Sequence, residues 1–257
     1  MKRLLAALSF FTRLPFWRLA SLSQRHYSRV VPFWPLTGWL TAAVMTAVFW
    51  TASLVFPVWV AVTLSFLTRL LITGAIHEDG LADFFDGFGG GYDRQSTLRI
   101  MKDSHIGTYG VIALIIYFLL TVEAVCAMAN RPHGILLIFL CADPFAKWVA
   151  SNIINVLPYA RSSEEAKNKL VYETMTLTER LIGFVAGVTP SLIVAFFIEK
   201  SWTLVIPIAA ATFTGACIMW MCNKRLKAYT GDCCGACFLI SELVFFLAAA
   251  GVVCANA

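Results

Sequence analysis

The chain has 257 residues, of which 59% are hydrophobic and only 14% charged, and its mean hydropathy is +0.75. A soluble domain usually carries about a quarter charged residues, so this composition excludes an ordinary soluble domain and indicates an integral membrane protein. The formal net charge of +5 gives no reason to expect nucleic acid as a partner, because basic connections between membrane helices account for it.

The first 30 residues are predicted to form an amphipathic segment in the membrane interface. Lys2 and Arg3 precede a short apolar run, as they would in a secretory signal peptide. Arg13 and Pro15 interrupt that run, and no small-residue cleavage site precedes a soluble domain. A segment that lies along the bilayer surface is the better interpretation.

Seven apolar stretches are each near the length of about 20 residues that crosses the hydrocarbon core. Pro57 alone separates the first two, which could form one kinked hairpin. No repeat or low-complexity linker divides the chain. We therefore predict one all-α transmembrane domain over residues 1–257, a polytopic helical bundle of about seven transmembrane helices. The predicted spans are 36–56, 58–76, 108–129, 135–157, 181–198, 203–222 and 235–255.

The basic residues predict how the bundle is oriented. If the N-terminus is cytoplasmic, sixteen Lys and Arg residues fall in cytoplasmic segments, and only Arg131 and Lys200 fall on the other side. This is a strong positive-inside bias. It places the connection 77–107, which carries most of the candidate functional groups, on the cytoplasmic side.

Three aspartates in that connection have the spacing of one helix face. Asp79, Asp83 and Asp86 stand at i, i+4 and i+7, within an arc of about 60° on a helix. Crowded carboxylates repel one another unless a cation lies between them, and Mg²⁺ binds carboxylates together with water and substrate phosphates. We predict that these three bind Mg²⁺; the alternative is a solvated acidic helix face. His77, about 200° from Asp79 on the helix, is expected to be a hydrogen-bonded interfacial histidine.

Basic residues follow in the same connection. Arg99, Lys102 and Asp103 share one face of a short helical segment. Arg99 and Lys102 are predicted to neutralise the oxygens of a metal-bound diphosphate, or, in the alternative, are ordinary positive-inside anchors. Asp86 is the first candidate for a general base, and Asp103 is the second.

Ionisable residues also occur within predicted spans, where they are costly and often mark function. Asp143 and Lys147, spaced i and i+4, are either a self-neutralising pair or a substrate contact. Asp232, at the start of the last span, either caps that helix or completes the polar site. The eight cysteines lie mostly within spans and are expected to be apolar packing residues.

Several segments together resemble the cobalamin 5′-phosphate synthases, also called adenosylcobinamide-GDP ribazoletransferases. The main match runs from His77 to Gly87 (HEDGLADFFDG) and resumes from Arg99 to Gly110 (RIMKDSHIGTYG). The segment 11–15 (FTRLP) is similar to the family's N-terminal signature. Segments 158–161, 230–236 and 241–244 are similar to its later motifs.

The resemblance implies a multi-pass enzyme of the bacterial inner membrane, with its active site facing the cytoplasm, that acts in the last steps of cobalamin biosynthesis. It implies that adenosylcobinamide-GDP is joined to α-ribazole 5′-phosphate, or to α-ribazole, with release of GMP and a requirement for Mg²⁺. A homo-oligomer is compatible with the sequence. The residues assigned to catalysis are Asp83, Asp86 and Asp103, those assigned to the metal are Asp79, Asp83 and Asp86, and those assigned to substrate are Arg13, Arg99, Lys102, Arg161 and Asp232.

For this reaction we expect a ribose hydroxyl of the ribazole to attack the phosphorus nearer the cobinamide arm, so that GMP leaves. Two other interpretations compete. A CDP-alcohol phosphotransferase of phospholipid synthesis also holds a diphosphate with spaced aspartates, but its pattern requires Ala-Arg where this chain has Ala82-Asp83. An ion-coupled transporter would favour inverted repeats and broken helices near the midplane, and no repeat is visible here.

Overall fold

The computed structural model describes residues 1–128, 134–160, 171–195 and 204–255. The described elements are helices, and one isolated β-bridge pairs Tyr159 with Tyr229. They are α1 (Lys2–Phe11), η1 (Phe16–Leu19), α2 (Gln24–Tyr27), η2 (Val31–Phe33), α3 (Trp34–Ser53), α4 (Val58–Thr73), α5 (Ile76–Gly90), α6 (Arg94–Ile100), α7 (Thr108–Cys126), α8 (Gly134–Ser151), α9 (Ile153–Val156), α10 (Leu177–Ile193), α11 (Val205–Leu226) and α12 (Gly231–Ala255).

The expected all-α membrane fold is confirmed. Among the described residues, five segments are long and apolar enough to cross a membrane, and α4 with α5 makes a sixth candidate that is bent by 91°. The predicted span 181–198 begins in α10 and runs into residues outside the described part, so the count of seven stays a prediction. The five segments are Val31–Ser53, Thr108–Cys126, Leu137–Val156, Val205–Leu226 and Gly231–Ala255.

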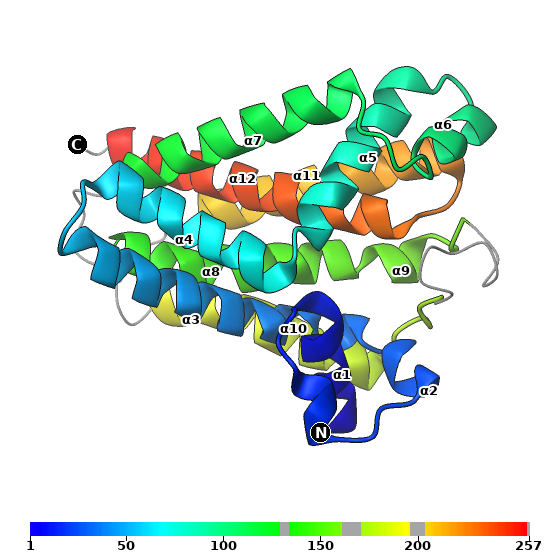
Figure 1. Ribbon diagram of the computed structural model, residues 1–257, viewed down its shortest axis with the longest axis horizontal. Helices are drawn as coiled ribbons and strands as arrows, with labels where there is room; N and C mark the ends of the chain where they lie inside the picture. Colours follow the sequence, from blue (N-terminus) through cyan, green and yellow to red (C-terminus); the bar gives the residue numbers. More distant parts are fainter. Residues whose placement is uncertain (129–133, 161–170, 196–203, 256–257) are drawn as a thin grey trace.

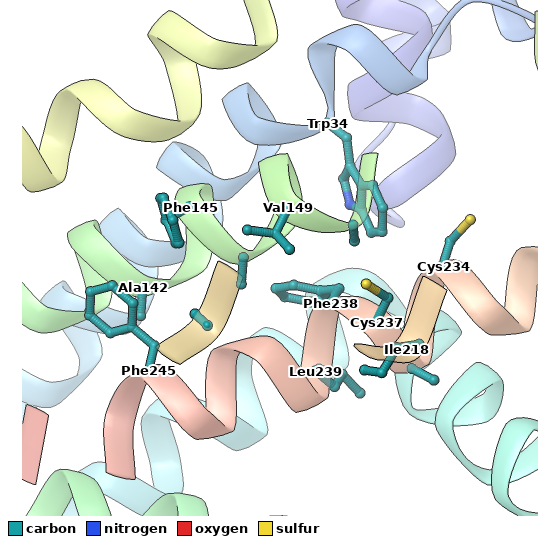
Figure 2. Packing of buried hydrophobic residues seen from close by; sticks show 14 of the residues in the cluster. Trp34, Ala142, Phe145, Val149, Ile218, Cys234, Cys237, Phe238, Leu239 and Phe245 are labelled. Carbon is teal, nitrogen blue, oxygen red and sulfur yellow. The ribbon is translucent and has the colours of Figure 1, made fainter. Parts of the chain in front are cut away.

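Helix α12 lies at the centre of the bundle and packs against α5, α7, α8 and α11. Its Phe238, Leu239 and Phe245 are fully buried. Figure 2 shows Phe238 and Phe245 on the side towards Phe145 and Val149 of α8, and Leu239 beside Ile218 of α11. Because α12 is apolar around its whole circumference, it is suited to an interior position with helices on every side.

The main helices run along the long axis of the molecule, and their basic connections gather at one end (Figure 1). There, Arg94 Nε donates to the Leu226 carbonyl over 2.9 Å and an Arg94 terminal nitrogen donates to the Ala160 carbonyl over 3.3 Å. Arg225 donates to the Gly91 carbonyl. Three of the connections that the sequence assigns to the cytoplasmic side are therefore tied to one another.

The N-terminal segment is docked on the same end of the bundle. Helix α1 buries Ala6, Ala7 and Phe11 and packs against α3 and η2. An Arg3 guanidinium nitrogen lies 2.9 Å from Glu179 Oε1 in α10. The apolar face of α1 thus contacts protein, and the place of the N-terminal segment in the membrane interface stays a prediction.

A buried ionic network links α4, α7, α8 and α12. Arg69 donates to Glu242 over 2.5 Å and to the Tyr117 hydroxyl over 2.7 Å. Lys147 pairs with Asp143, and Arg69 lies 3.7 Å from the same carboxylate. The four charged side chains are at most 1% exposed and sum to zero charge, which is how buried charges are normally tolerated.

Candidate active site

A cavity of about 260 Å³ lies at the end of the bundle where the basic connections gather. Its walls come from α1, η2, α3, α5, α12 and the segments on either side of residues 161–170. Asp79 of α5 and Asp232 of α12 both line it. Two carboxylates that are distant in the sequence therefore share one recess.

Helices α5 and α12 approach each other closely where glycines face across the contact. A Cβ on Gly80 would lie 3.1 Å from the Cα of Asp232, and a Cβ on Gly235 would lie 3.0 Å from the His77 carbonyl oxygen. Small residues allow backbones to pack at such short range. The contact places Asp79, the neighbour of Gly80, opposite the start of α12.

The 91° bend between α4 and α5 sets the direction of the aspartate-bearing helix. Gly74 has φ +70° and Ala75 has φ +59°, a left-handed conformation that glycine adopts at little cost. The Arg13 backbone N–H donates to the Ile72 carbonyl over 2.7 Å. A Cβ at Gly74 would collide with the Arg13 side chain, so this candidate substrate ligand lies over the turn that starts α5.

The three aspartates of α5 lie in different surroundings. Asp79 is exposed and Asp83 is partly buried, whereas Asp86 is 8% exposed. Within the described residues no group of three or more Asp, Glu, His or Cys side chains is arranged to hold a metal ion. The structure does not bring the three predicted ligands together as one cluster, and their metal role stays a prediction.

Asp86 contacts the start of helix α7 instead. Its Oδ2 accepts from the Gly107 backbone N–H at 2.7 Å, and its Oδ1 accepts from that of Gly110 at 2.9 Å. Backbone N–H groups in the first turn of a helix have no partner within the helix, and a carboxylate there is stabilising. Asp86 thus caps α7 from another helix, a role that the sequence analysis missed.

Helix α6 carries the first of the candidate phosphate ligands. It begins with a capping box in which the Asp93 carboxylate accepts from the Ser96 backbone N–H and from the Ser96 hydroxyl, each at 2.7 Å. These two hydrogen bonds lower the pKa of Asp93. Met101, just after the helix, packs against α5 at Gly87. Arg99 of α6 and Lys102 just after it are both exposed.

Asp103 is also exposed, and its carboxylate is occupied by its own loop. Oδ1 accepts from the His105 backbone N–H at 3.0 Å and lies 2.7 Å from the His105 Nδ1. These hydrogen bonds lower the pKa of Asp103, and the one from the His105 backbone has the largest effect. A carboxylate with a lowered pKa is a weak general base near neutral pH.

The segment that leads to Arg161 is fixed at the same end, but Arg161 itself lies outside the described residues. The Ala160 N–H donates to the Tyr229 carbonyl over 2.8 Å, and the Tyr229 N–H donates to the Pro158 carbonyl over 2.9 Å. The rings of Tyr159 and Tyr229 meet edge to face with centroids 5.2 Å apart. Burial raises the pKa of Tyr229 far above its ordinary value, so its hydroxyl stays protonated.

Aromatic rings make up much of the cavity wall. Phe11 and Trp34 stack with centroids 4.9 Å apart and planes 8° apart, and Phe10 meets Tyr172 edge to face at 6.0 Å. His77 is 4% exposed and packs 5.4 Å from Trp34. The interfacial histidine expected from the sequence is therefore buried among aromatic rings, and its Nε2 has no hydrogen-bond partner.

The family model described as cobalamin-5-phosphate synthase matches residues 3–250. The chain belongs to the cobalamin-5-phosphate synthase family. The resemblance given by the HEDGLADFFDG and RIMKDSHIGTYG segments is thereby confirmed.

Curated relatives of this synthase cover nearly the whole chain. A protein of Ralstonia pickettii named adenosylcobinamide-GDP ribazoletransferase is 37% identical over 93% of this chain and 91% of its own length. A protein with the same name from Vibrio parahaemolyticus is 34% identical over 96% of this chain and 91% of its own length. Another from Shewanella amazonensis is 35% identical over 95% of this chain and 92% of its own length. No solved structure matches.

The oxygen donors of this family member suit a hard cation. Asp79 and Asp232 line the same cavity, and Asp83 follows Asp79 by one helical turn. Mg²⁺ typically takes only one or two carboxylates and completes its shell with water and substrate phosphates. The residues present therefore fit Mg²⁺, which Asp79 and Asp83 would hold, with Asp232 of α12 in the same cavity as Asp79; both Asp86 oxygens already accept hydrogen bonds from the start of α7.

Proposed function

We propose that this chain is an adenosylcobinamide-GDP ribazoletransferase. It joins adenosylcobinamide-GDP to α-ribazole 5′-phosphate, or to α-ribazole, and releases GMP. The observation that carries the proposal is the shared cavity of Asp79 and Asp232, in a chain that relatives of this name match over more than nine-tenths of its length. The family match favours this activity over the CDP-alcohol phosphotransferase and transporter interpretations.

The proposed cofactor is Mg²⁺, held by Asp79 and Asp83 on adjacent turns of α5. When bound, it would neutralise the diphosphate and orient it for an in-line displacement. Arg99 and Lys102, exposed on α6 and just after it, are proposed to bind the phosphate of the leaving GMP. Arg13, whose side chain lies over the turn before α5, is proposed to contact the same diphosphate.

The proposed reaction is a single phosphoryl transfer. A ribose hydroxyl oxygen of the ribazole bonds to the phosphorus nearer the cobinamide arm, the bond from that phosphorus to the GMP oxygen breaks, and GMP leaves as an anion. We assign the hydroxyl proton to Asp232, which is 9% exposed in the cavity wall and accepts from the Thr230 hydroxyl at 3.2 Å. Asp86 is a poorer candidate because both of its oxygens accept backbone N–H bonds from the start of α7, and Asp103 because the His105 hydrogen bonds lower its pKa.

The decisive experiment measures GMP release by the purified protein in lipid nanodiscs. Adenosylcobinamide-GDP and α-ribazole 5′-phosphate are supplied with and without Mg²⁺. Wild-type protein should release GMP only with Mg²⁺, Asp83→Asn should abolish release, and Asp232→Asn should lower kcat while leaving the Mg²⁺ requirement unchanged. Near-normal turnover by Asp83→Asn in folded protein rules out the assignment, and cleavage of CDP-diacylglycerol would instead support the phospholipid enzyme.

The cavity end is proposed to face the cytoplasm of a bacterial inner membrane. The end of α12 offers a way to test this, because Cys254 is exposed there, whereas the other cysteines are partly or fully buried. A membrane-impermeant maleimide should label Cys254 in intact spheroplasts. Labelling only after lysis would reverse the proposed orientation.

A further inference from the structure

The aromatic cavity beside Asp79 and Asp232 has a part in the reaction that the carboxylates do not explain. Six of its lining side chains are rings, contributed by α1, α3, α5 and the segments on either side of residues 161–170. Aromatic walls of this kind bind flat rings by stacking. The six are Phe10, Phe11, Trp34, His77, Tyr159 and Tyr172.

The size of the cavity suits a small ring better than the corrinoid. Its volume of about 260 Å³ is just below the roughly 300–1,000 Å³ of sites for drug-sized ligands. A corrin macrocycle with its side arms is much larger than such ligands, whereas a bicyclic base is smaller. The large donor substrate must therefore lie mainly outside the cavity.

The charges of the lining disfavour a phosphate anywhere in its interior except next to the Mg²⁺ proposed at Asp79. The lining holds no Lys or Arg, and its two charged members are the carboxylates Asp79 and Asp232. The candidate phosphate ligands lie elsewhere: Arg99 on α6, Lys102 just after it, and Arg13 over the turn before α5. A neutral ring can enter beside two carboxylates, but an anion cannot do so without a cation.

The polar groups at the wall are few. Val31, Ile76 and Cys234 present apolar surface. Burial holds the pKa of Tyr172 well above its ordinary value, so its hydroxyl is a neutral donor. A guanine base presents several donors and acceptors at its edge, and because Asp79 is assigned to Mg²⁺ and Asp232 to the hydroxyl proton, few wall groups would remain to pair with them. A benzimidazole, whose edge is mainly carbon, leaves little unpaired.

We propose that this cavity binds the benzimidazole base of the ribazole acceptor. This inference rests on the proposed function. It places the nucleosides of the two substrates in different positions: the ribazole base lies inside the cavity, and the guanosine of the donor lies outside it. The ribose then lies at the rim next to Asp79 and Asp232. The hydroxyl that attacks is thereby brought to the carboxylate assigned to receive its proton.

The test compares three tyrosine variants of the full chain in nanodiscs. Tyr172→Ala removes a ring from the wall, Tyr172→Phe keeps the ring and removes the hydroxyl, and Tyr92→Ala removes a ring that is 85% exposed and outside the cavity. Tyr172→Ala should raise the KM for α-ribazole 5′-phosphate about ten- to hundredfold, the range expected for one lost base–aromatic stacking contact. The KM of Tyr172→Ala for the GDP-activated donor should stay within about twofold. Tyr172→Phe should retain most of the acceptor binding, because it keeps the ring, and Tyr92→Ala should leave both constants within about twofold.

A binding measurement separates this inference from the proposed function. Unphosphorylated α-ribazole is titrated into the protein without Mg²⁺ or donor, and Trp34→Phe serves to assign the change in tryptophan fluorescence. Saturable binding that guanosine does not compete with supports the inference even if the protein releases no GMP. Competition by guanosine, absence of α-ribazole binding, or a rise in donor KM in Tyr172→Ala would overturn it.

Discussion

The Asp86 carboxylate, near the end of α5, accepts a hydrogen bond of 2.9 Å from the backbone N–H of Gly110 in the first turn of α7. The contact leaves no room for a side chain at position 110, because a Cβ on Gly110 would lie 2.5 Å from Asp86 Oδ2. The contact links α5 to the start of α7, on either side of the segment between them. It therefore holds in place the loop that carries Lys102 and Asp103.

Replacement of Asp86 should act on stability before it acts on metal binding. Asp86→Ala is expected to lower the free energy of unfolding by about 1–2 kcal/mol, the usual effect of removing a helix-capping carboxylate. Gly110→Ala should destabilise the protein in the same way, while Gly251→Ala, where a Cβ meets nothing within 4 Å, should not. Thermal unfolding in detergent measures all three. If Asp86→Asn raised the Mg²⁺ concentration for half-maximal activity more than tenfold without a change in Tm, Asp86 would be a metal ligand after all.

Asp103→Asn should leave the shape of the pH–activity profile unchanged. The His105 hydrogen bonds favour the ionised form and lower the pKa of Asp103 below its ordinary value. Their stabilising effect is therefore fully present above that ordinary value, near pH 4, and is lost as the pH falls through the lowered pKa. Between about pH 5.5 and 8.5 the group does not titrate, and kcat/KM measured over that range tests this. A shifted acidic limb in the variant would identify Asp103 as the base.

Lys102→Ala should weaken use of the donor substrate while retaining the Mg²⁺ requirement. Loss of one charge-assisted contact with a phosphate corresponds to about a 10- to 100-fold fall in kcat/KM. Lys2→Ala, which removes another exposed lysine, is the matched control and should have no effect. Equal activity of the two variants would mean that Lys102 serves only as a positive-inside anchor.

The Asp143–Lys147 pair should behave as a structural unit. Both side chains are 1% exposed, and Asp143 also accepts from the Thr41 hydroxyl at 2.8 Å. Lys147→Met alone should destabilise the fold by roughly 3–5 kcal/mol, because it leaves a buried carboxylate without its cation. The double variant Asp143→Leu/Lys147→Met should cost clearly less than the two single changes together, as measured by equilibrium unfolding in mixed micelles. Additive effects, or a raised substrate KM in stable protein, would instead indicate a substrate contact.

The α-helical membrane fold and the grouping of basic connections at one end could be read directly from the chain. Both depend on properties that are local in sequence: runs of apolar residues of bilayer length and Lys or Arg between them. The acidic helix with Asp79 and Asp83 was predicted for the same reason, since a spacing of i and i+4 is a helical repeat.

The arrangement of the site, in contrast, depends on contacts between residues that are distant in the sequence. Asp86 shares a helix face with Asp79 and Asp83, yet its oxygens bond to Gly107 and Gly110 of another helix. The pattern did contain a signal, because glycines at the start of a predicted helix allow a close approach to its free N–H groups. Nothing in the spacing, however, could say which carboxylate would make that approach.

What the residues determined by themselves is the class of protein: an apolar α-helical chain of the cobalamin-5-phosphate synthase family, with acidic and basic groups concentrated at one end. Only the tertiary structure decided which acids meet. The 91° bend after α4 and the close glycine contact between α5 and α12 bring Asp232 to the cavity of Asp79. They do so beside aromatic rings from distant segments whose proximity no sequence period encodes. Such contacts depend on helix directions and packing distances, which a linear pattern of side chains does not contain.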